Sequence, residues 1–438
     1  MEQSKIRRKD RIKLVFYGDD FTGSTDALEC ICRAGLDTLL FIEPPNEKDL
    51  ALFPNLQAFG IAGKTRSLPP EEMEKILIPA FERLKSIGVQ HVHYKVCSTF
   101  DSSPVVGSIG KAIDCGAAVF NTTIIPVLGG NPALGRYCAF GNLFAKMGIG
   151  SNGETYRLDR HPSMSRHPVT PADESDLRLH LEKQTSKKIG LIDIIGIDKP
   201  TKTWKEGISE QVVLIDALYE WQLTKIGEWL SEHTDDKPLF SVGSSSIEMA
   251  LGKYWYKDYS VRPYRDWKYP GKASPLLVVS GSCSPVTTGQ IDWAKANGFE
   301  EVELDAIRIC QEDVVAANIM DTVNQFLHEQ KNVIVHTGKK QSQNLSSEKL
   351  GTALGTIAKE AVRQTGIKRI VLSGGDTSSY AARALEITAV EMIAPLVTGA
   401  PLCKAYSKNK MVEGLEVNFK GGQVGGEDYF GVMVRGEL

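Results

Sequence analysis

Short apolar runs alternate with amphipathic segments along most of the chain. Each run is bounded by Gly, Pro, Asn or Asp and predicts a strand, whereas apolar positions spaced about 3.6 residues apart predict helices. In the first half we expect strands at 14–17, 37–42, 56–61, 89–96, 117–125, 189–195, 212–215 and 240–242, and helices at 24–34, 70–87, 105–115 and 218–230. This alternation predicts an α/β fold with largely parallel sheets flanked by helices.

The second half follows the same plan, with strands expected at 276–279, 301–304, 333–336 and 369–372 and helices between them. Two stretches interrupt the pattern. Residues 126–171 lack a period, which is typical of a functional or mobile loop, and residues 251–275 have the composition of a crossover between domains. A chain of 438 residues is too long for one ordinary core. We therefore predict a first domain at 1–255, a linker at 256–274 and a second domain at 275–438.

Composition narrows the classes of partner. A hydrophobic content of 42%, a charged content of 24% and a net charge of −3 are typical of a soluble globular protein. The aromatic and basic segment 251–275 could stack on single-stranded nucleic acid, but the acidic chain favours packing at a domain junction. No run approaches the ~20 apolar residues of a transmembrane helix, and the polar N-terminus is unlike a signal peptide.

The eight cysteines are scattered and form no C-x-x-C pair, so we expect reduced thiols and a cytoplasmic location. A disulfide framework or a zinc site does not fit this spacing. We predict that the chain has neither a nucleic-acid nor a membrane partner. The sequence does not fix the oligomeric state, and a homodimer is left open.

Two aspartates follow the first predicted strand directly. Asp19 and Asp20 come after Gly18, and Thr22 then leads into a helix. In an open α/β sheet, ligands bind beyond the C-terminal ends of the strands. Carboxylates at that place can hold a divalent cation or accept a proton from a hydroxyl group. The alternative is that they only cap the helix, since Asp and Thr are good N-cap residues.

Basic and hydroxyl side chains follow two other strands of the first half. Lys64 and Arg66 come after the third strand, and Lys95 and Ser98 come after the fourth. Because these residues stand where strands end, they could converge on one crevice with the aspartates. Cations would pair with the carboxylate of a small polyhydroxy acid, while an Asp would accept its hydroxyl proton. Each cation taken alone is more simply explained as a surface charge.

The aperiodic stretch carries a further group of cations. Arg157 and Arg160 lie in one short segment with His161, Arg166 and His167. Cations this close together can bind an anionic ligand, and a solvated loop is an equal alternative. Arg157 and Arg160 are therefore candidate substrate contacts. Thr22, which follows the two aspartates, is another candidate substrate contact.

Three loops of the second half are built from small and polar residues, at 280–285, 373–379 and 419–428. Glycines let the backbone approach an anion closely, and free N–H groups at a helix start favour phosphate oxygens. Together the loops predict a nucleotide-phosphate site, although each alone would serve as a helix cap. Neither G-x-x-x-x-G-K-[ST] nor a G-x-G-x-x-G after the first strand is present. The candidate nucleotide contacts are Ser280, Ser282, Ser284, Gly374, Gly375, Asp376, Thr377, Ser378, Gly421 and Gly422.

Several of these segments, in this order, resemble motifs of the four-carbon acid sugar kinase family. They are DDFTGS at 19–24, KTRS at 64–67, YKVCST at 94–99, SGSCSPVTTGQIDWA at 280–294, GGDTSS at 374–379 and FKGGQVGG at 419–426. The resemblance covers nearly the whole chain. It implies two α/β domains, of which the N-terminal one binds an acid sugar and the C-terminal one binds ATP.

By position, the resemblance implies ATP contacts at Ser282 and its neighbours, at 375–378 and at 421–422. It implies substrate contacts at Asp19, Asp20, Arg66 and Lys95.

The chain departs from the family pattern after the fourth strand. Typical members read K-x-D-S-T-L-R-G-N, whereas residues 95–103 read KVCSTFDSS. Cys97 replaces an acid, and Asp101 with Ser102 replaces an Arg-Gly pair, so a substrate-side cation is lost. The substrate is therefore expected to differ from threonate or erythronate. Relatives with this altered loop resemble those that act on 3-oxo-isoapionate, a branched sugar acid. Arg157 or Arg160 would then replace the missing cation.

These observations lead to one hypothesis and two alternatives. The hypothesis is an ATP-dependent kinase that phosphorylates a terminal hydroxyl of a small sugar acid, four-carbon or branched five-carbon. Mg²⁺ would bridge the nucleotide phosphates, and Asp19 or Asp20 would deprotonate the acceptor. The first alternative is a non-catalytic protein that binds an acidic metabolite. The second is a metal-dependent phosphatase that uses Asp19 and Asp20, which leaves the three loops of the second half unexplained.

Overall fold

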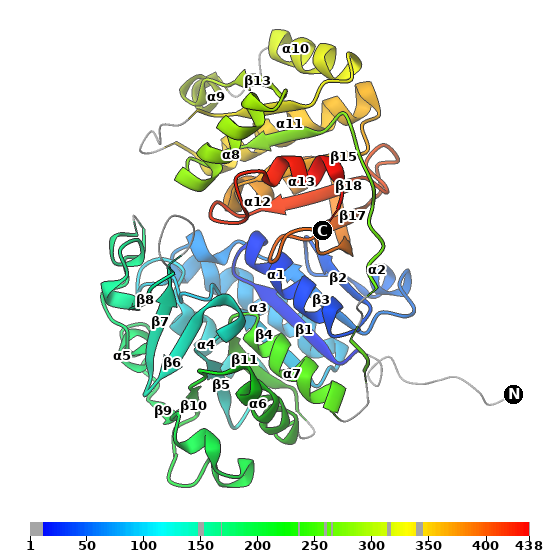
Figure 1. Ribbon diagram of the computed structural model, residues 1–438. Coiled ribbons are helices and arrows are strands. Elements are labelled where there is room, and N and C mark those ends of the chain that lie inside the picture. The colour runs from blue at the N-terminus through cyan, green and yellow to red at the C-terminus, as the bar shows by residue number, and fades with distance from the viewer. Residues whose placement is uncertain are drawn as a thin grey trace, which may run out of the picture. The chain divides into compact units, whose positions relative to one another are not determined.

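The computed structural model describes residues 12–147, 153–167, 169–234, 237–257, 261–263, 266–312, 317–338 and 345–437 (Figure 1). Contacts within the chain divide it into two compact units. The N-terminal unit comprises residues 1–38 and 44–264, and the C-terminal unit comprises residues 39–43 and 265–438. Each unit is an α/β structure built on its own run of parallel strands, as the alternation of patterns predicts.

The N-terminal unit is built on a parallel sheet in which every strand is buried. Its strand order is β3-β1-β4-β11-β5-β10-β9, and all neighbouring strands in this order are parallel. The strands are β1 (Leu14–Gly18), β3 (Ala58–Ala62), β4 (His91–Lys95), β5 (Ile125–Leu128), β9 (Ile189–Ile192), β10 (Val212–Ile215) and β11 (Leu239–Gly243). Their apolar side chains and the helices on both faces form the core.

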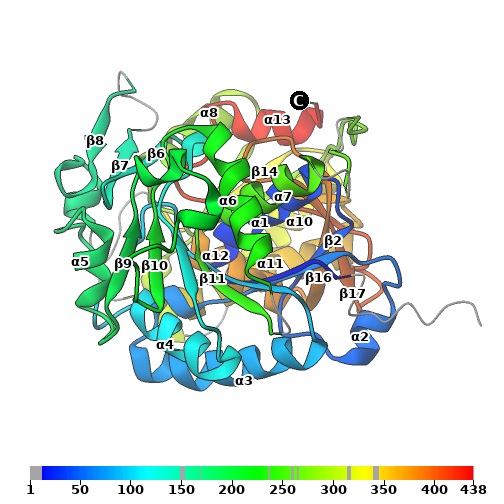
Figure 2. The ribbon, with the colours of Figure 1, turned by 90° about the horizontal axis from the view of Figure 1, so that it is seen from below.

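Helices cover both faces of this sheet, as Figure 2 shows from below. On one face α3 packs against α4, and on the other α6 packs against α7 and α7 against α1. The helices are α1 (Phe21–Arg33), α2 (Glu47–Ala51), α3 (Pro70–Ile87), α4 (Ile109–Phe120), α5 (Leu177–Glu182), α6 (Glu220–Glu232) and α7 (Ser246–Lys257). Phe81, Phe120 and Phe240 meet beneath α3 and α4, with ring centroids 5.3–5.6 Å apart.

Two predictions for the N-terminal unit are wrong. The strand expected at 117–125 begins as helix, because Ala117 to Phe120 continue the apolar face of α4, which ends where Asn121 adopts φ 49°. The strand itself begins only at Ile125. The aperiodic stretch 126–171 is also no single loop. It contains a small antiparallel sheet of β6 (Arg136–Ala139), β7 (Asn142–Lys146) and β8 (Thr155–Arg157).

The C-terminal unit has a mixed sheet with the order β13-β14-β12-β15-β18-β17-β16-β2. The pairs from β13 to β18 are parallel, and the pairs from β18 to β2 are antiparallel. The strands are β2 (Thr38–Phe41), β12 (Leu277–Ser280), β13 (Glu300–Glu303), β14 (Val333–His336), β15 (Arg369–Ser373), β16 (Ile387–Ala394), β17 (Leu402–Ser407) and β18 (Glu416–Lys420).

The helices of this unit are α8 (Pro285–Ala296), α9 (Ala306–Glu312), α10 (Ala317–His328), α11 (Ser347–Thr365), α12 (Gly375–Ala384) and α13 (Tyr429–Arg435). Helix α8 packs against α13, and α11 packs against α12. A core cluster that includes Val278, Ile291, Val371 and Phe430 joins the sheet to α8 and α13.

Strand β2 comes from the N-terminal part of the sequence but contributes contacts to the C-terminal unit. Leu39 to Phe41 pair with β16, and Arg383 donates to the Glu43 carboxylate at 3.0 Å and to the Ile42 carbonyl at 3.2 Å. At the other end, α7 extends to Lys257, two residues into the predicted linker. Residues 258–260, 264 and 265 of that linker lie outside the described residues. The domain boundaries themselves stay a prediction.

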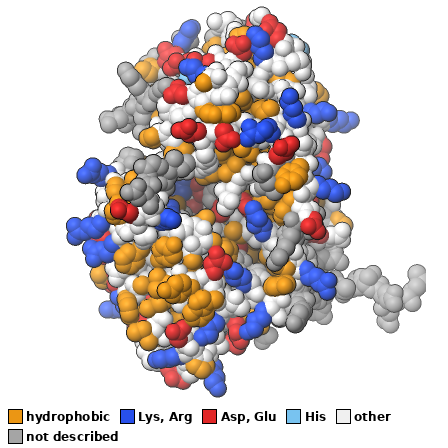
Figure 3. All heavy atoms as spheres, viewed as in Figure 1, with side chains coloured by type: hydrophobic (Ala, Val, Ile, Leu, Met, Phe, Trp, Pro, Cys, Tyr) orange, Lys and Arg blue, Asp and Glu red, His pale blue; other side chains and the backbone are white. Residues whose placement is uncertain are grey.

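On the face shown in Figure 3, acidic, basic and hydrophobic side chains are interspersed on both units. Within the part of the chain that the structure describes, no helix combines the length and apolar character needed to cross a membrane.

Candidate active site

Asp20 is the N-cap residue of α1, at the C-terminal end of β1. Its Oδ1 accepts from the Gly23 N–H at 2.9 Å, and its Oδ2 accepts from the Thr22 hydroxyl at 2.9 Å and from Arg66 Nη2 at 2.6 Å. Burial of Asp20 opposes its charge, but Arg66, Lys95 and these hydrogen bonds hold its pKa below the usual range. Asp20 is therefore an ionised carboxylate whose acceptor positions are largely occupied.

Asp19 lies beside Asp20 in a different environment. It is 3% exposed, and its buried Oδ1 has no hydrogen-bond partner among the described residues. Burial, together with the neighbouring charges of Asp20 and Asp101, raises the pKa of Asp19 to about 7, although Arg66 and Lys95 act in the opposite direction. A carboxyl with that pKa and a free oxygen is suited to accept a proton near neutral pH. The two adjacent aspartates thus have different chemical capacities.

Two cations accompany the aspartates, and they differ in exposure. Lys95, at the end of β4, is 2% exposed; its Nζ donates to the Val96 carbonyl at 3.0 Å and lies 4.0 Å from Asp26 Oδ2. The side chain of Arg66 is 30% exposed and pairs with Asp20. Lys95 therefore neutralises the buried acids, whereas Arg66 has further N–H groups available for a ligand. Asp19, Asp20, Asp26, Arg66 and Lys95 are called the carboxylate cluster below.

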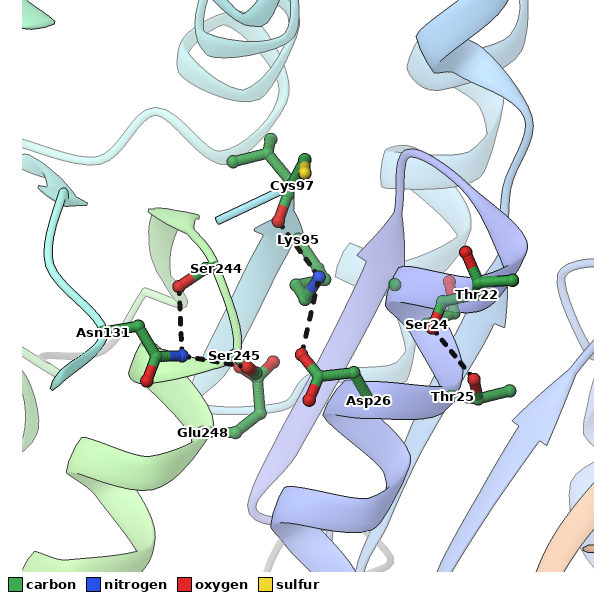
Figure 4. Close-up of polar contacts among 12 residues, drawn as sticks. Thr22, Ser24, Thr25, Asp26, Lys95, Cys97, Asn131, Ser244, Ser245 and Glu248 are labelled. Carbon is green, nitrogen blue, oxygen red and sulfur yellow. Dashed lines mark hydrogen bonds and ion pairs between the residues drawn. The ribbon is translucent and has the colours of Figure 1, made fainter. Parts of the chain in front are cut away.

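A polar network extends from the carboxylate cluster to the next strands (Figure 4). Asp26 accepts a hydrogen bond from Ser245, and the amide Nδ2 of Asn131 lies 3.1 Å from Ser245 Oγ and 3.4 Å from Ser244 Oγ. Gly243 of β11 and Lys95 of β4 are paired in the sheet. The C-terminal ends of β1, β4, β11 and β5 therefore share one connected set of buried polar side chains.

His93 and Glu248 lie deeper in the same unit. His93 Nδ1 is 2.5 Å from Glu248 Oε1, and His93 Nε2 is 3.1 Å from the Gly243 carbonyl. This completely buried pair holds α7 against β4 and β11. Both ring nitrogens of His93 therefore have structural partners, the Glu248 carboxylate and the Gly243 carbonyl.

Four predicted substrate contacts, Lys64, Ser98, Arg157 and Arg160, have no side-chain hydrogen bond or ion pair to the carboxylate cluster among the described residues. Lys64 is exposed at the start of a short turn, and Ser98 is half-buried in the loop after β4. Arg157 makes a two-point ion pair with Asp159 at 2.6 and 2.7 Å, and Arg160 lies 3.6 Å from the same carboxylate. Arg157 and Arg160 thus already share an acidic partner.

The loop that departs from the family pattern carries its own hydrogen bonds. The Thr99 hydroxyl donates to Asp101 Oδ1 at 2.7 Å and lies 3.1 Å from Cys97 Sγ. Burial raises the pKa of the Cys97 thiol to about 12, so the thiol is neutral. A small cavity separates this loop from the segment after β8, where Leu158 rather than an arginine lines the wall. The proposal that Arg157 or Arg160 replaces the missing cation stays a prediction.

In the C-terminal unit the three glycine-rich loops follow adjacent strands. Strands β12, β15 and β18 are neighbours in the order β12-β15-β18, and each pair is parallel. The loops after them therefore begin at one edge of the sheet. They are residues 280–284, 373–378 and 420–422, called the phosphate loops below. The sequence could predict each loop but not that their strands are adjacent.

The Thr287 hydroxyl joins two of the phosphate loops. Its Oγ1 lies 3.1 Å from both Ser282 Oγ and Ser284 Oγ, 3.2 Å from the Gly422 carbonyl and 2.9 Å from Lys420 Nζ. Ser284 also caps α8, since its Oγ accepts from the Thr287 N–H, and it contacts the Gly422 carbonyl. These contacts hold the first and third loops together.

The middle phosphate loop begins α12. Gly374 adopts φ 117°, which favours glycine, and no side chain caps the first turn of the helix. A Cβ added at Gly281 would lie 2.3 Å from Thr377 Oγ1, so the first loop can approach the middle one only as glycine. Ser280, Ser373 and Ser378 are buried, and Asp376 is exposed. Uncapped N–H groups at a helix start are a favourable place for a phosphate.

The sequence does not predict several of the side chains at the carboxylate cluster and at the phosphate loops. Thr287, Lys420 and Gln290 lie within the motifs at 280–294 and 419–426, but no local feature of the sequence marks them as functional. Gln290 Nε2 donates to the carbonyls of Val424 and Gly426 at 3.0 and 2.9 Å, which fixes the glycine-rich loop after β18. Asn131 and the Ser244–Ser245 pair gave a weaker signal, since only their place after β5 and β11 could have pointed to them.

Two family models match this chain. Residues 14–251 match a model described as a sugar-binding N-terminal domain, and residues 277–430 match one described as a nucleotide-binding C-terminal domain. A 3-oxo-isoapionate kinase of Paraburkholderia graminis is 39% identical over 97% of this chain and 94% of its own length. The chain belongs to the four-carbon acid sugar kinase family. The predicted class, a kinase of small sugar acids with two α/β domains, is thereby confirmed.

More distant members of the four-carbon acid sugar kinase family match over a similar span. A 3-oxo-tetronate kinase of Methylobacterium radiotolerans is 27% identical over 94% of this chain and 96% of its own length. Among solved structures, a protein of Salmonella typhimurium has a TM-score of 0.75 at 24% identity, covering 97% of this chain and all of that one. Haemophilus influenzae protein HI1011 has a TM-score of 0.71 at 22% identity, covering 96% and 98%. These two likenesses support the fold.

Proposed function

We propose that this kinase transfers the γ-phosphoryl group of ATP to a terminal hydroxyl of a branched 3-oxo sugar acid, with 3-oxo-isoapionate as the first candidate. The observation that carries the proposal is the 39% identity, across almost the full length of both chains, to a 3-oxo-isoapionate kinase. Identity to the 3-oxo-tetronate kinases is 25–27%. The altered loop with Cys97 and Asp101 supports the same choice, because it removes a cation that the typical family pattern contains.

Asp19 is the general base of the proposed reaction. It takes the proton of the acceptor hydroxyl on its free Oδ1 while the hydroxyl oxygen bonds to the γ-phosphorus and the bond to ADP breaks. A base works best when its pKa is close to the working pH, and the pKa of Asp19 is raised to about 7. Asp20 is a weaker candidate because Thr22, Gly23 and Arg66 occupy its oxygens.

Arg66 is the proposed partner of the substrate carboxylate. Its guanidinium uses Nη2 for Asp20 and is 30% exposed, so other N–H groups can form a paired hydrogen bond with a carboxylate. Lys95 supports this arrangement because its ammonium group neutralises the buried carboxylates. Lys64 and Ser98 stay predicted contacts.

The phosphate loops hold the nucleotide in this proposal. Glycine N–H groups, the uncapped start of α12 and the Ser282 hydroxyl supply donors for phosphate oxygens. Ser284, whose hydroxyl contacts the Gly422 carbonyl, stays a predicted contact. Within the described residues, no three His, Cys, Asp or Glu side chains gather as a metal site. Mg²⁺ commonly binds through substrate phosphates and one or two carboxylates. Asp376 is the carboxylate that would hold it, and the ion would neutralise phosphate charge.

A coupled assay of ADP release tests the substrate. The purified protein is given ATP, Mg²⁺ and, in turn, 3-oxo-isoapionate, 3-oxo-tetronate, threonate and erythronate. We expect kcat/KM to be at least about tenfold higher for 3-oxo-isoapionate than for 3-oxo-tetronate, since a site built for one skeleton discriminates by this order. Preference for 3-oxo-tetronate would overturn the substrate but keep the kinase, and no ADP from any acid would overturn ATP-dependent transfer to these acids. The oligomeric state, for which the sequence leaves a homodimer open, can be measured by light scattering.

A further inference from the structure

Lys420 is a completely buried lysine at the phosphate loops. Its Nζ donates to Thr287 Oγ1 and to the Gly421 carbonyl, each at 2.9 Å, and lies 5.4 Å from the centre of the Tyr429 ring. A hydroxyl, a carbonyl and an aromatic ring satisfy hydrogen bonds but leave the positive charge without a neutralising partner. Among the described residues, burial is the only influence that shifts its pKa, and no carboxylate contributes.

Other deeply buried cations of this chain have carboxylate partners. Lys95 lies 4.0 Å from Asp26, and Arg369, which is 1% exposed, pairs with Glu416 at 2.6 Å. Burying an ammonium group without such a partner is unfavourable, and burial lowers the pKa of Lys420 to about 7. At neutral pH the free protein therefore carries this amine in both its charged and its neutral form.

Lys420 lies behind the point where the phosphate loops meet. Its side chain contacts Thr287, which links the first and third loops, and its carbonyl accepts from the Gly374 N–H of the middle loop at 2.8 Å. The groups facing Nζ are Thr287 of α8, Gly421 of its own loop and Tyr429 of α13, whose hydroxyl donates to Asn418. None of them is a carboxylate, so an anion held by the loops would supply the missing negative charge.

We propose that the phosphate of the nucleotide is the counter-ion of Lys420, so that nucleotide binding is coupled to the uptake of one proton by this amine. The proposal rests on the nucleotide site of the proposed function. The proton comes from solvent and ends on Nζ, and no other bond changes. Lys420 is a positioning residue, because it acts through Thr287 and Gly421. The coupling makes nucleotide affinity depend on pH.

Proton uptake is measured by isothermal titration calorimetry of Mg·ADP binding at about pH 8, in two buffers that differ in ionisation enthalpy. At that pH the free amine is mostly neutral and the phosphates of the nucleotide are already ionised. We expect the wild type to take up more than about half a proton and Lys420→Met to take up none. At about pH 7, Lys420→Met should bind Mg·ADP at least about tenfold more weakly, as expected for the loss of a charge-assisted contact.

Lys404→Met is the matched control. Lys404 lies on β17, is half-buried and stands 4.8 Å from the centre of the Tyr406 ring, so the same substitution is made beside an aromatic ring but away from the phosphate loops. It should leave affinity and proton uptake unchanged. Equal proton uptake by the wild type and Lys420→Met would overturn the proposal.

A second measurement keeps the proposal testable if Lys420→Met does not fold. Because binding raises the pKa of the amine above its free value, affinity is greatest below about pH 7 and falls as pH rises towards the bound pKa. The Kd of wild-type Mg·ADP should therefore rise up to about tenfold per pH unit between about pH 7 and pH 9. A constant Kd over that range overturns the coupling alone. Absence of Mg·ADP binding at every pH would instead contradict the nucleotide site itself.

Discussion

In both units the candidate site lies at the C-terminal ends of parallel strands, but the charged groups at these two places differ. In the N-terminal unit, the C-terminal ends of β1 and β4 carry Asp19, Asp20 and Lys95, and the lysine faces buried carboxylates. In the C-terminal unit, the ends of β12, β15 and β18 carry glycines and hydroxyls, and no carboxylate among the described residues contributes to the environment of Lys420. The cations of the first edge are paired with carboxylates, whereas the buried amine of the second has no such partner in the described part of the chain.

This difference indicates which kind of ligand each set of strand ends can bind. A carboxyl whose proton affinity is raised by burial and by neighbouring acids can remove a proton from a neutral alcohol. Uncapped N–H groups over a buried ammonium can receive an anion without a competing acid nearby. The same fold class can therefore provide a site for a neutral alcohol and a site for an anion. Substitutions at the carboxylate cluster should leave the phosphate loops unchanged, and the reverse should also hold.

Asp19→Asn is expected to have the largest effect. The amide keeps the size of the side chain but cannot accept the proton, so kcat should fall on the order of 10² to 10³. The Kd of Mg·ADP, measured by calorimetry, should stay unchanged, because Asp19 belongs to the other edge. A variant with full turnover would contradict the assignment of the base.

Asp20→Asn is the matched comparison for that variant. Asn also caps helices well, so α1 should keep its start, while the ion pair with Arg66 is lost. Steady-state kinetics should show a smaller fall in kcat and a higher KM for the sugar acid. A greater loss of kcat in Asp20→Asn than in Asp19→Asn would exchange the two roles.

Gly374→Ala should weaken nucleotide binding at the phosphate loops of the C-terminal unit. Gly374 has φ 117°, which an alanine adopts only with strain, so the turn before α12 must shift. We expect KM for ATP to rise about tenfold, as for a site whose donors are displaced, with little change in KM for the sugar acid. Gly289→Ala is the control, because a Cβ there meets nothing within 4 Å. Equal effects of both substitutions would indicate a general loss of stability.

The pH dependence of kcat/KM for the sugar acid should report the carboxylate cluster of the free enzyme. Asp19 must be ionised to act, and its pKa is about 7, so kcat/KM should rise about tenfold per pH unit below that value and level off above it. The measurement is kcat/KM for the sugar acid at saturating ATP from acid to mildly alkaline pH. A flat profile below neutral pH would show that another group takes the proton.

Ser284→Ala should have the smallest effect. It removes the cap of α8 and the contact with the Gly422 carbonyl, which should cost about 1 kcal/mol. Scanning calorimetry should show a fall of about 2–4 °C in the Tm of the transition that ADP stabilises. Ser346→Ala removes the cap of α11 instead and serves as the comparison. An unchanged Tm would show that the contacts of Ser284 do not stabilise the loop.

Local patterns were sufficient for most of the fold. The strand before Asp19 and the helix 70–87 were predicted within a residue, because their apolar spacing and their Gly and Pro boundaries are local signals. The failure at 117–125 has the same origin. The apolar run Ala117–Phe120 fits a buried strand as well as the end of α4, and periodicity cannot separate the two.

The candidate site was predictable only in part. Asp19, Asp20 and the glycine loops stand out because they directly follow strands. Arg157 and Arg160 were proposed from charge alone, and the structure shows that Asp159 already pairs with both. Lys420 was overlooked because a lysine in a sequence is normally exposed, and only packing shows that this one is buried.

By itself the sequence determined the elements, the motifs and, through the motifs, the family, since all of these depend on residues close together in the chain. The tertiary structure decided which residues share an environment. It placed Thr287 against Lys420, and it gave Asp19 and Asp20 opposite shifts in pKa. The physical reason is that burial and charge act through space, so Arg66 and Lys95, which are distant in sequence, contribute strongly to the pKa values of the two adjacent aspartates.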